Sequence, residues 1–281
     1  MSEAQLVPEE RTLDTGIFYR RWAIGAPRAA VLLVHGLGEH SGRYQHVADK
    51  LATRGLECWA PDHPGHGRSP GHRCHIDAFD EYFAALNALR DEIGVAHPGL
   101  PCFIVGHSLG GLIVGNYLLT QQQQFSGAAF SAAAFEAPEA PSATAMFINK
   151  LIASVLPRLG VLQLDASQVS RDAAVVSRYL EDPLVHDGKS SARLVVELFA
   201  AMETLRRRRG EISLPTLIMH GEGDVMTAPM GSQHFFDGIG SSDKTLRLYP
   251  GLYHEIFNEP ERAQVLGELC DWVNAHLSGD G

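Results

Sequence analysis

Short strand-like runs alternate along the chain with longer segments in which apolar residues recur every three or four positions. The runs are mostly apolar and short, and they cover residues 29–34, 56–60, 102–105, 125–134, 216–220 and 245–249. Runs of this kind predict strands that are buried in a sheet. The segments predicted to be helices cover residues 43–54, 79–93, 109–119 and 260–277, of which 109–119 is apolar almost throughout. The alternation predicts an α/β fold with a mostly parallel central sheet and helices on both faces.

Residues 15–23 precede this alternation and carry Ile17, Tyr19 and Trp22. Aromatic and β-branched residues at this spacing predict an early strand. We expect this strand to be half of a hairpin at the edge of the sheet.

The alternation stops between residues 135 and 213, where no strand-like run is evident. Two helices are predicted there, one from Met146 to Leu156, ended by Pro157, and one over residues 194–205. A helical block between two halves of one sheet predicts a cap over the strand ends. We therefore expect residues 1–134 and 213–281 to form the core and residues 135–212 to form the cap.

Composition is that of an ordinary globular protein, with 45% hydrophobic and 20% charged residues among 281. The 23 basic and 33 acidic residues give a net charge of −10, which disfavours a nucleic-acid partner. Residues 1–10 lack the basic flank and apolar run of a signal peptide, and no apolar stretch is long enough to span a bilayer. We expect a cytoplasmic protein with reduced cysteines, because no C-x-x-C spacing occurs.

One turn joins a predicted strand directly to a predicted helix. Between the strand that ends at Val105 and the helix that starts at Leu109 lies the sequence Gly-His-Ser-Leu-Gly, residues 106–110. This is the G-x-S-x-G pattern of a nucleophile elbow in the strand–turn–helix setting that the motif requires. The turn strains its central residue and leaves no room for side chains two positions to either side. Ser108 is therefore the candidate nucleophile.

A serine hydroxyl at neutral pH needs a histidine to take its proton, and the histidine needs an acid to fix its tautomer. In this fold the order along the chain is serine, acid, histidine. Asp224 follows the strand at 216–220, and His254 follows the strand at 245–249. Both loops leave the carboxyl ends of strands, on the same sheet edge as Ser108, where open α/β sheets place their sites.

Other residues compete for these roles. Glu222 and Glu255 are alternative acids, but Glu222 lies nearer the strand end and Glu255 would have to fold back onto the adjacent histidine. Four histidines in one glycine- and proline-rich loop suggest a metal site: His63, His66, His72 and His75. No cysteine or other ligand pattern supports zinc there, so we expect hydrogen-bonding histidines and no metal or other cofactor.

Acyl transfer also requires donors for the oxyanion. Such donors are the backbone N–H groups of the residue after the nucleophile and of a residue in the loop after an earlier strand. Here these are Leu109 and Leu37, and Leu37 stands between two glycines.

These motifs together resemble the monoacylglycerol lipase family of α/β-hydrolases. The resemblance runs in unbroken order from about Val31 to Phe257, and it is carried by residues 35–44 (HGLGEHSGRY), 62–69 (DHPGHGRS), 106–111 and 182–184, and by the Asp224 and His254 loops. It implies hydrolysis of monoacylglycerols to fatty acid and glycerol in a narrow pocket beneath a helical cap. It also implies that Glu39, Arg43 and Tyr179 help to hold the glycerol end.

Alternatives stay open within and beyond this family. Similar sequences include lysophospholipases, and a general carboxylesterase uses the same residues. A non-catalytic ligand receptor on the same fold would often lack one member of the triad, whereas all three candidates are present here.

The cap helix at 146–156 has two interpretations. Its apolar stripe of Ile148, Leu151, Ile152 and Val155 either seats the helix on the core or forms a lid that touches lipid aggregates and lines an acyl tunnel. The second interpretation predicts transient, peripheral contact with membranes. The basic run Arg206 to Arg209 is interpreted as a solvated helix end that complements the helix dipole.

Overall fold

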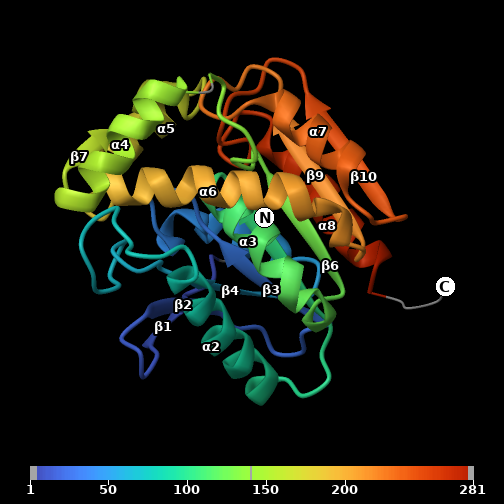
Figure 1. Ribbon diagram of the computed structural model, residues 1–281. Helices are drawn as coiled ribbons and strands as arrows, with labels where there is room; N and C mark the ends of the chain where they lie inside the picture. Colours follow the sequence, from blue (N-terminus) through green and yellow to red (C-terminus); the bar gives the residue numbers. More distant parts are fainter. Residues whose placement is uncertain (1–4, 140, 278–281) are drawn as a thin grey trace.

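The computed structural model describes residues 5–139 and 141–277. Its main sheet has eight strands in the order β1-β2-β4-β3-β5-β6-β9-β10 (Figure 1). Their bounds are β1 Glu9–Thr12, β2 Phe18–Trp22, β3 Ala29–Val34, β4 Leu56–Pro61, β5 Cys102–His107, β6 Gly127–Ser131, β9 Thr216–Gly221 and β10 Lys244–Tyr249. All neighbours from β4 to β10 pair in parallel. The predicted α/β fold class is therefore confirmed.

The hairpin expected at the sheet edge is formed by β1 and β2, which pair antiparallel. β2 in turn pairs antiparallel with β4. The hairpin thus attaches the start of the described chain to the parallel part of the sheet.

Helices cover both faces of this sheet. α1 (Gln45–Ala52) and α8 (Arg262–Ala275) pack on one face; α2 (Glu81–Ala96), α3 (Leu109–Gln121) and α7 (Pro229–Gly238) pack on the other. Strand β3 is apolar throughout because it is buried on both faces. Val31 and Leu33 pack in the core beneath α1 and α8, while Leu32 and Val34 pack in the core beneath α2, α3 and α7. A strand buried on both faces needs an apolar residue at every position.

Between β6 and β9 the chain forms a separate group of elements. They are α4 (Ala143–Val155), β7 (Gly160–Leu162), α5 (Ala173–Glu181), β8 (Ser190–Ser191) and α6 (Ala192–Arg208). In Figure 1 α4 and α5 lie together at one end of the molecule, and α6 runs across the front of α3. The division into a core and a cap at residues 135 and 212 stays a prediction, and its outer ends, residues 1 and 281, lie outside the described residues.

α6 belongs to this group in sequence, but it packs into the core. Leu194, Leu198 and Leu205 are buried in the same cluster as the residues of α3. In addition, the side-chain amide of Asn116 in α3 donates to the carbonyl of Ala201 at 3.2 Å. α4 rests on α6, so α6 connects the inserted elements to the sheet.

One prediction about this region was wrong, and one of the two interpretations of the cap helix is excluded. The segment contains strands, because β7 and β8 pair antiparallel; they are so short that periodicity does not reveal them. The apolar stripe of α4 does not seat the helix on the core, because Ile148, Leu151 and Val155 are 51%, 58% and 71% exposed.

Helices α5 and α7 were not predicted, and each buries few apolar side chains.

No helix in the described ranges combines the length and the apolar character that crossing a bilayer requires.

Candidate active site

The turn between β5 and α3 has the strained geometry that the G-x-S-x-G pattern predicts. Ser108 lies between the two elements with φ 53° and ψ −120°, a backbone conformation that residues with a side chain rarely adopt. A Cβ atom at Gly106 would lie 2.6 Å from the carbonyl oxygen of Gly110, and one at Gly110 would collide with the carbonyl oxygen of Val34. Glycine is therefore required at both positions.

Ser108, His254 and Asp224 meet through their side chains. His254 Nε2 lies 2.9 Å from Ser108 Oγ, and His254 Nδ1 lies 2.7 Å from Asp224 Oδ2. All three residues are buried. This is the contact order that proton transfer from a serine to a histidine requires, with the carboxylate on the far nitrogen of the ring.

The loops that carry Asp224 and His254 are placed by two adjacent strands. β9 and β10 pair in parallel with Gly221 opposite Tyr249, so the loops after them leave the sheet side by side. Their backbones are close, because a Cβ atom at Gly221 would collide with the carbonyl oxygen of Leu252. The rival acids lie elsewhere: Glu222 is exposed, and Glu255 binds Arg43.

Asp224 is held as an anion by its surroundings. Burial alone would raise its pKa, but the charge of His254 and hydrogen bonds from His220 and His254 hold the pKa well below its usual range. The backbone N–H groups of Met226 and Thr227 donate to Oδ1 at 2.7 and 3.1 Å. The carboxylate is thus ionised and fixed in orientation before a substrate arrives.

The surroundings of His254 raise its pKa, whereas those of Asp224 lower the pKa of the carboxylate. Burial alone would lower its pKa, yet the charge of Asp224 and the hydrogen bond to it outweigh burial and raise the pKa above its ordinary value. The neighbouring His107, whose ring centre lies 4.9 Å from that of His254, behaves differently, because burial lowers its pKa to about 3. His254 is therefore the ring of this pair that binds a proton more readily.

The two backbone donors proposed for the oxyanion stand next to Ser108. Leu37 and Leu109 line the same cavity as Ser108 and His254. The loop after β3 approaches the nucleophile closely, because a Cβ atom at Gly36 would lie 3.1 Å from Ser108 Cβ. Among the residues that the structure describes, neither the N–H of Leu37 nor that of Leu109 donates to a protein acceptor. Both are available to a ligand.

Glu39, Arg43 and Tyr179 are bound to one another. Arg43 donates to Glu39 Oε2 at 2.7 Å and to both carboxylate oxygens of Glu255 at 2.6 and 2.8 Å. The Tyr179 ring lies 4.6 Å from the guanidinium carbon. Glu39 also accepts from the N–H of Gly36 at 2.7 Å. Glu39 thereby fixes the loop that carries Leu37.

The predicted role of these residues at the glycerol end remains a prediction. Glu39 and Tyr179 line a space of about 20 Å³ beside Ser108, together with Glu255, whereas Arg43 does not line it. In the sequence, Glu255 stood out only as an alternative acid. No local signal reveals its pairing with Arg43, since the two residues are 212 positions apart.

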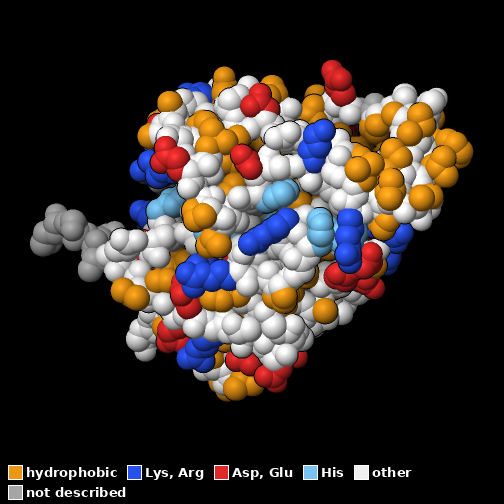
Figure 2. Space-filling model, turned by 90° about the vertical axis from the view of Figure 1, so that its left-hand side faces the viewer, with side chains coloured by type: hydrophobic (Ala, Val, Ile, Leu, Met, Phe, Trp, Pro, Cys, Tyr) orange, Lys and Arg blue, Asp and Glu red, His pale blue; other side chains and the backbone are white. Residues whose placement is uncertain are grey.

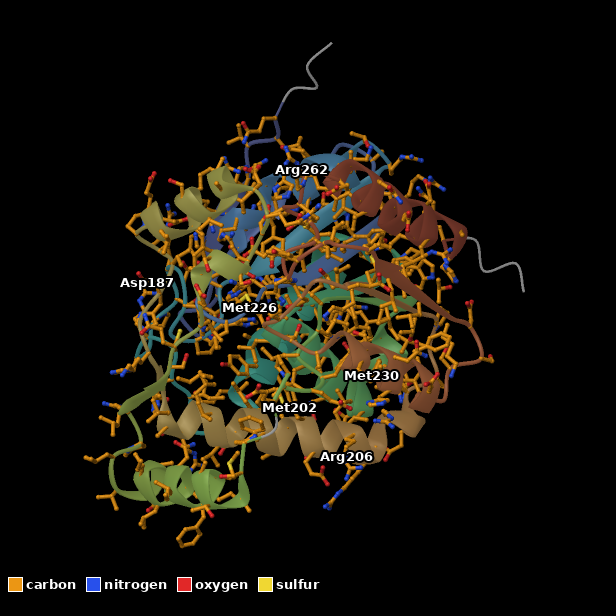
Figure 3. The ribbon with its side chains drawn as sticks, turned by 90° about the horizontal axis from the view of Figure 1, so that it is seen from above. Asp187, Met202, Arg206, Met226, Met230 and Arg262 are labelled. Carbon is orange, nitrogen blue, oxygen red and sulfur yellow. The ribbon has the colours of Figure 1, made fainter. Side chains whose placement is uncertain are left out.

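A cavity of about 1190 Å³ extends from the triad beneath α4 and α6. Met202 on α6 and Met226 in the loop after β9, both labelled in Figure 3, line it. Further apolar residues of its wall come from α4, β7 and α6: Ala145, Met146, Val161, Leu162, Val195, Leu198 and Phe199. Such a wall suits an acyl chain.

The histidine-rich loop makes hydrogen bonds within the protein. His63 Nε2 donates to the carbonyl of His35 at 3.0 Å, and His66 Nδ1 lies 2.9 Å from the carbonyl of Pro64. His75 Nδ1 lies 2.9 Å from Ser191 Oγ. Burial lowers the pKa of His63 to about 3 and that of His66 to about 4. These rings are neutral and support the loops around the site.

The basic run at the end of α6 is paired with acids. Arg206 and Arg207 both contact Glu203, and Arg208 contacts Glu211. These exposed pairs contribute little to stability, and because Arg206 and Arg207 share a single carboxylate, this helix end keeps an excess of positive charge.

The sheet topology and the serine between β5 and α3 place the chain among the α/β-hydrolases of the serine type. A family model described as "Serine aminopeptidase, S33" matches residues 25–261. A monoacylglycerol lipase of Mycolicibacterium smegmatis is 39% identical over 254 residues, which are 89% of this chain and 90% of that protein. The chain belongs to the monoacylglycerol lipase family of α/β-hydrolases.

Two solved structures are similar throughout. The crystal structure of Paleococcus ferrophilus monoacylglycerol lipase is 34% identical with a TM-score of 0.84, covering 92% of this chain and 99% of that chain. A soluble variant of monoglyceride lipase from Saccharomyces cerevisiae, in complex with a substrate analog, is 26% identical with a TM-score of 0.85. That match covers 100% of this chain and 98% of the yeast chain.

Proposed function

We propose that this protein hydrolyses the ester bond of monoacylglycerols and releases fatty acid and glycerol through an acyl-enzyme on Ser108. The observation that carries the proposal is the position of His254, which contacts Ser108 Oγ with one nitrogen and Asp224 with the other. The resemblance to monoacylglycerol lipases over most of the chain supports the substrate class.

The reaction proceeds in two halves. His254 Nε2 takes the proton of Ser108 as Oγ attacks the ester carbonyl, and the N–H groups of Leu37 and Leu109 stabilise the oxyanion. His254 then gives this proton to the departing glycerol oxygen, which leaves the acyl group on Ser108. In the second half, His254 deprotonates a water molecule that attacks the acyl-enzyme. The fatty acid leaves, and the proton returns to Ser108.

The charge of the space beside Ser108 favours a neutral head group over a phosphate. Among the described residues that line this space or the large cavity there is no lysine or arginine, while Glu39 and Glu255 line the space at the predicted glycerol end. A lysophospholipid would bring a phosphate to a site without a cation to pair with it. A monoacylglycerol brings only hydroxyl groups, which pair with neutral and acidic partners alike.

We therefore expect kcat/KM to be at least about tenfold higher for a monoacylglycerol than for a lysophosphatidate with the same acyl chain, because about 1.4 kcal/mol of charge repulsion has this effect. Hydrolysis is measured by release of the shared fatty acid below the aggregation limit of both lipids. A short-chain p-nitrophenyl ester is the reference substrate for a general carboxylesterase. Equal or faster hydrolysis of the lysophosphatidate contradicts the head-group assignment, and a preference for the short ester contradicts the acyl assignment.

The outer face of α4 is a candidate contact for lipid aggregates. Phe147, Leu151 and Val155 are 68%, 58% and 71% exposed, and Figure 2 shows hydrophobic side chains gathered over α4 at its upper right. Exposed apolar patches on a helix are typical of surfaces that touch membranes or partners. This face lies beside the cavity, because Met146 and Asn149 of the same helix line it.

Replacing both Phe147 and Leu151 with serine is expected to weaken binding to neutral lipid vesicles at least about tenfold, since each buried side chain of this size contributes roughly 2 kcal/mol. Vesicle flotation measures binding, and hydrolysis of a soluble ester is expected to stay unchanged. The matched control is Val95→Ser, which removes an exposed apolar side chain from α2, 80% exposed. Unaltered vesicle binding by the double variant would contradict the lipid-contact role.

A further inference from the structure

His220 is a buried histidine beside the triad, and the reaction outlined above gives it no role. It lies near the end of β9 and is fully buried. Its Nε2 atom lies 3.0 Å from Asp224 Oδ2, and its Nδ1 atom lies 2.7 Å from Ser232 Oγ in α7. Both ring nitrogens are therefore engaged, one of them by the acid of the triad.

These two contacts decide where His220 carries its hydrogen. A carboxylate only accepts hydrogen bonds, so the hydrogen belongs on Nε2 and is donated to Asp224. In this tautomer Nδ1 accepts from the hydroxyl of Ser232. Ser232 thus keeps His220 in the tautomer that donates to the acid.

The oxygen that faces His254 is shared among three donors. Asp224 Oδ2 lies 2.7 Å from His254 Nδ1, 3.0 Å from His220 Nε2 and 2.8 Å from Thr227 Oγ1. The single hydroxyl hydrogen of Thr227 also lies within reach of the carbonyl of Ala132, at 3.1 Å between the oxygens. His220 is therefore the steadier of the two donors outside the triad pair. A hydrogen bond to a carboxylate stabilises its charge and weakens its pull on other protons.

We propose that His220 is a positioning residue for ester hydrolysis: its Nε2–H holds Asp224 Oδ2 toward His254 and moderates the attraction of this carboxylate for the proton on His254. The inference rests on the proposed function of the triad. It concerns how readily His254 gives its proton up, which sets the fraction of enzyme with a free base at neutral pH.

Several charged or titratable groups act on His254 besides His220. They come from the loops after β9, β10 and β3 and from β5: Asp224, Glu255, Glu39 and His107. Arg43, in the short helix after the β3 loop, binds Glu255. The carboxylates Asp224, Glu255 and Glu39 all favour the protonated ring. Loss of a donor from Asp224 adds to this pull, because its charge is then less well satisfied.

The experiment is the pH profile of kcat/KM for a soluble ester in the His220→Leu and His220→Gln variants. We expect the acid limb of His220→Leu to move upward by about half a pH unit to one unit, as a lost hydrogen bond to a carboxylate predicts. On the acid side of that limb, kcat/KM then falls about three- to tenfold. His220→Gln retains an N–H donor of similar reach and is expected to return the limb toward its original position.

The matched control is His97→Leu, which removes another contact between a histidine and a carboxylate, His97 Nε2 to Glu57 Oε1 at 2.7 Å. Glu57 lies at the opening of β4, away from the strand ends that carry the triad. This variant is expected to lose stability without moving the acid limb.

The outcomes separate this inference from the proposed function. An unmoved limb in His220→Leu, with Ser108→Ala inactive, overturns the role of His220 and leaves the triad in place. Full turnover by Ser108→Ala overturns the triad itself. Should His220→Leu not fold, Ser232→Ala decides, because it removes the hydroxyl that fixes the tautomer of His220: a limb displaced upward supports the inference, and an unmoved limb overturns it.

Discussion

Replacing Ser108 with alanine is expected to abolish ester hydrolysis, with a loss of about 10⁶-fold in kcat, the size seen when a triad nucleophile is removed. No other hydroxyl in the described chain contacts His254 Nε2. The oxyanion donors and the cavity stay in place, so only the slow attack of water remains. The rate of fatty-acid release from a monoacylglycerol measures the effect.

The fold of this variant is expected to persist. Ser108 already occupies a strained conformation with φ 53°, and alanine meets the same strain as serine because both carry a Cβ atom. Thermal unfolding checks this point. Covalent labelling by a fluorophosphonate, measured by intact mass, is expected in the native protein and absent in the variant. Labelling of the variant, or turnover at the native rate, would rule out Ser108 as nucleophile; an unlabelled, inactive native protein would instead favour a ligand receptor.

Replacing Asp224 with asparagine is expected to lower kcat about 10⁴-fold, the loss known for neutralising the acid of such a triad. The hydrogen bonds around this residue explain why. Asp224 Oδ1 accepts from the N–H groups of Met226 and Thr227, so an asparagine there must place its carbonyl oxygen at Oδ1 and its amide nitrogen at Oδ2. The amide would then face His254 Nδ1 with its hydrogens.

The consequence is a change of tautomer. His254 Nδ1 has to accept the amide hydrogen, so the ring hydrogen moves to Nε2. Nε2 can then no longer receive the proton of Ser108. The loss is measured as kcat at the pH optimum, with Glu222→Gln as the control because Glu222 is exposed. A larger loss in Glu222→Gln than in Asp224→Asn would show that the acid had been misassigned.

The contact among Ser108, Asp224 and His254 could be predicted because each residue has a local signal. Two glycines flank Ser108, and Asp224 and His254 follow strands whose apolar residues are evident in the sequence. The parallel pairing of β9 and β10 then brings these loops together. Position after a strand selected the correct loops, since parallel strands deliver their carboxyl ends to one edge.

Other parts of the site depend on contacts between distant residues. His220 is the last residue of the strand predicted at 216–220, but its proposed role depends on Ser232 in α7, a helix that the sequence pattern did not predict. The pairing of Arg43 with Glu255 likewise could not be predicted from the sequence. Periodicity correctly placed Leu151 and Val155 on one side of a helix. It does not say whether the rest of the protein covers that side, and in the structure both side chains are exposed.

The attachment of α6 to α3 gives the cavity one fixed wall and one adjustable wall. Val195, Leu198 and Met202 line it from a helix that is continuous with the buried core. The opposite residues, Ala145 and Met146, belong to α4, which rests on α6 and buries only Ala153. Sequence changes on α4 can therefore alter the room for the acyl chain while the strand ends, and the proton path between them, keep their shape.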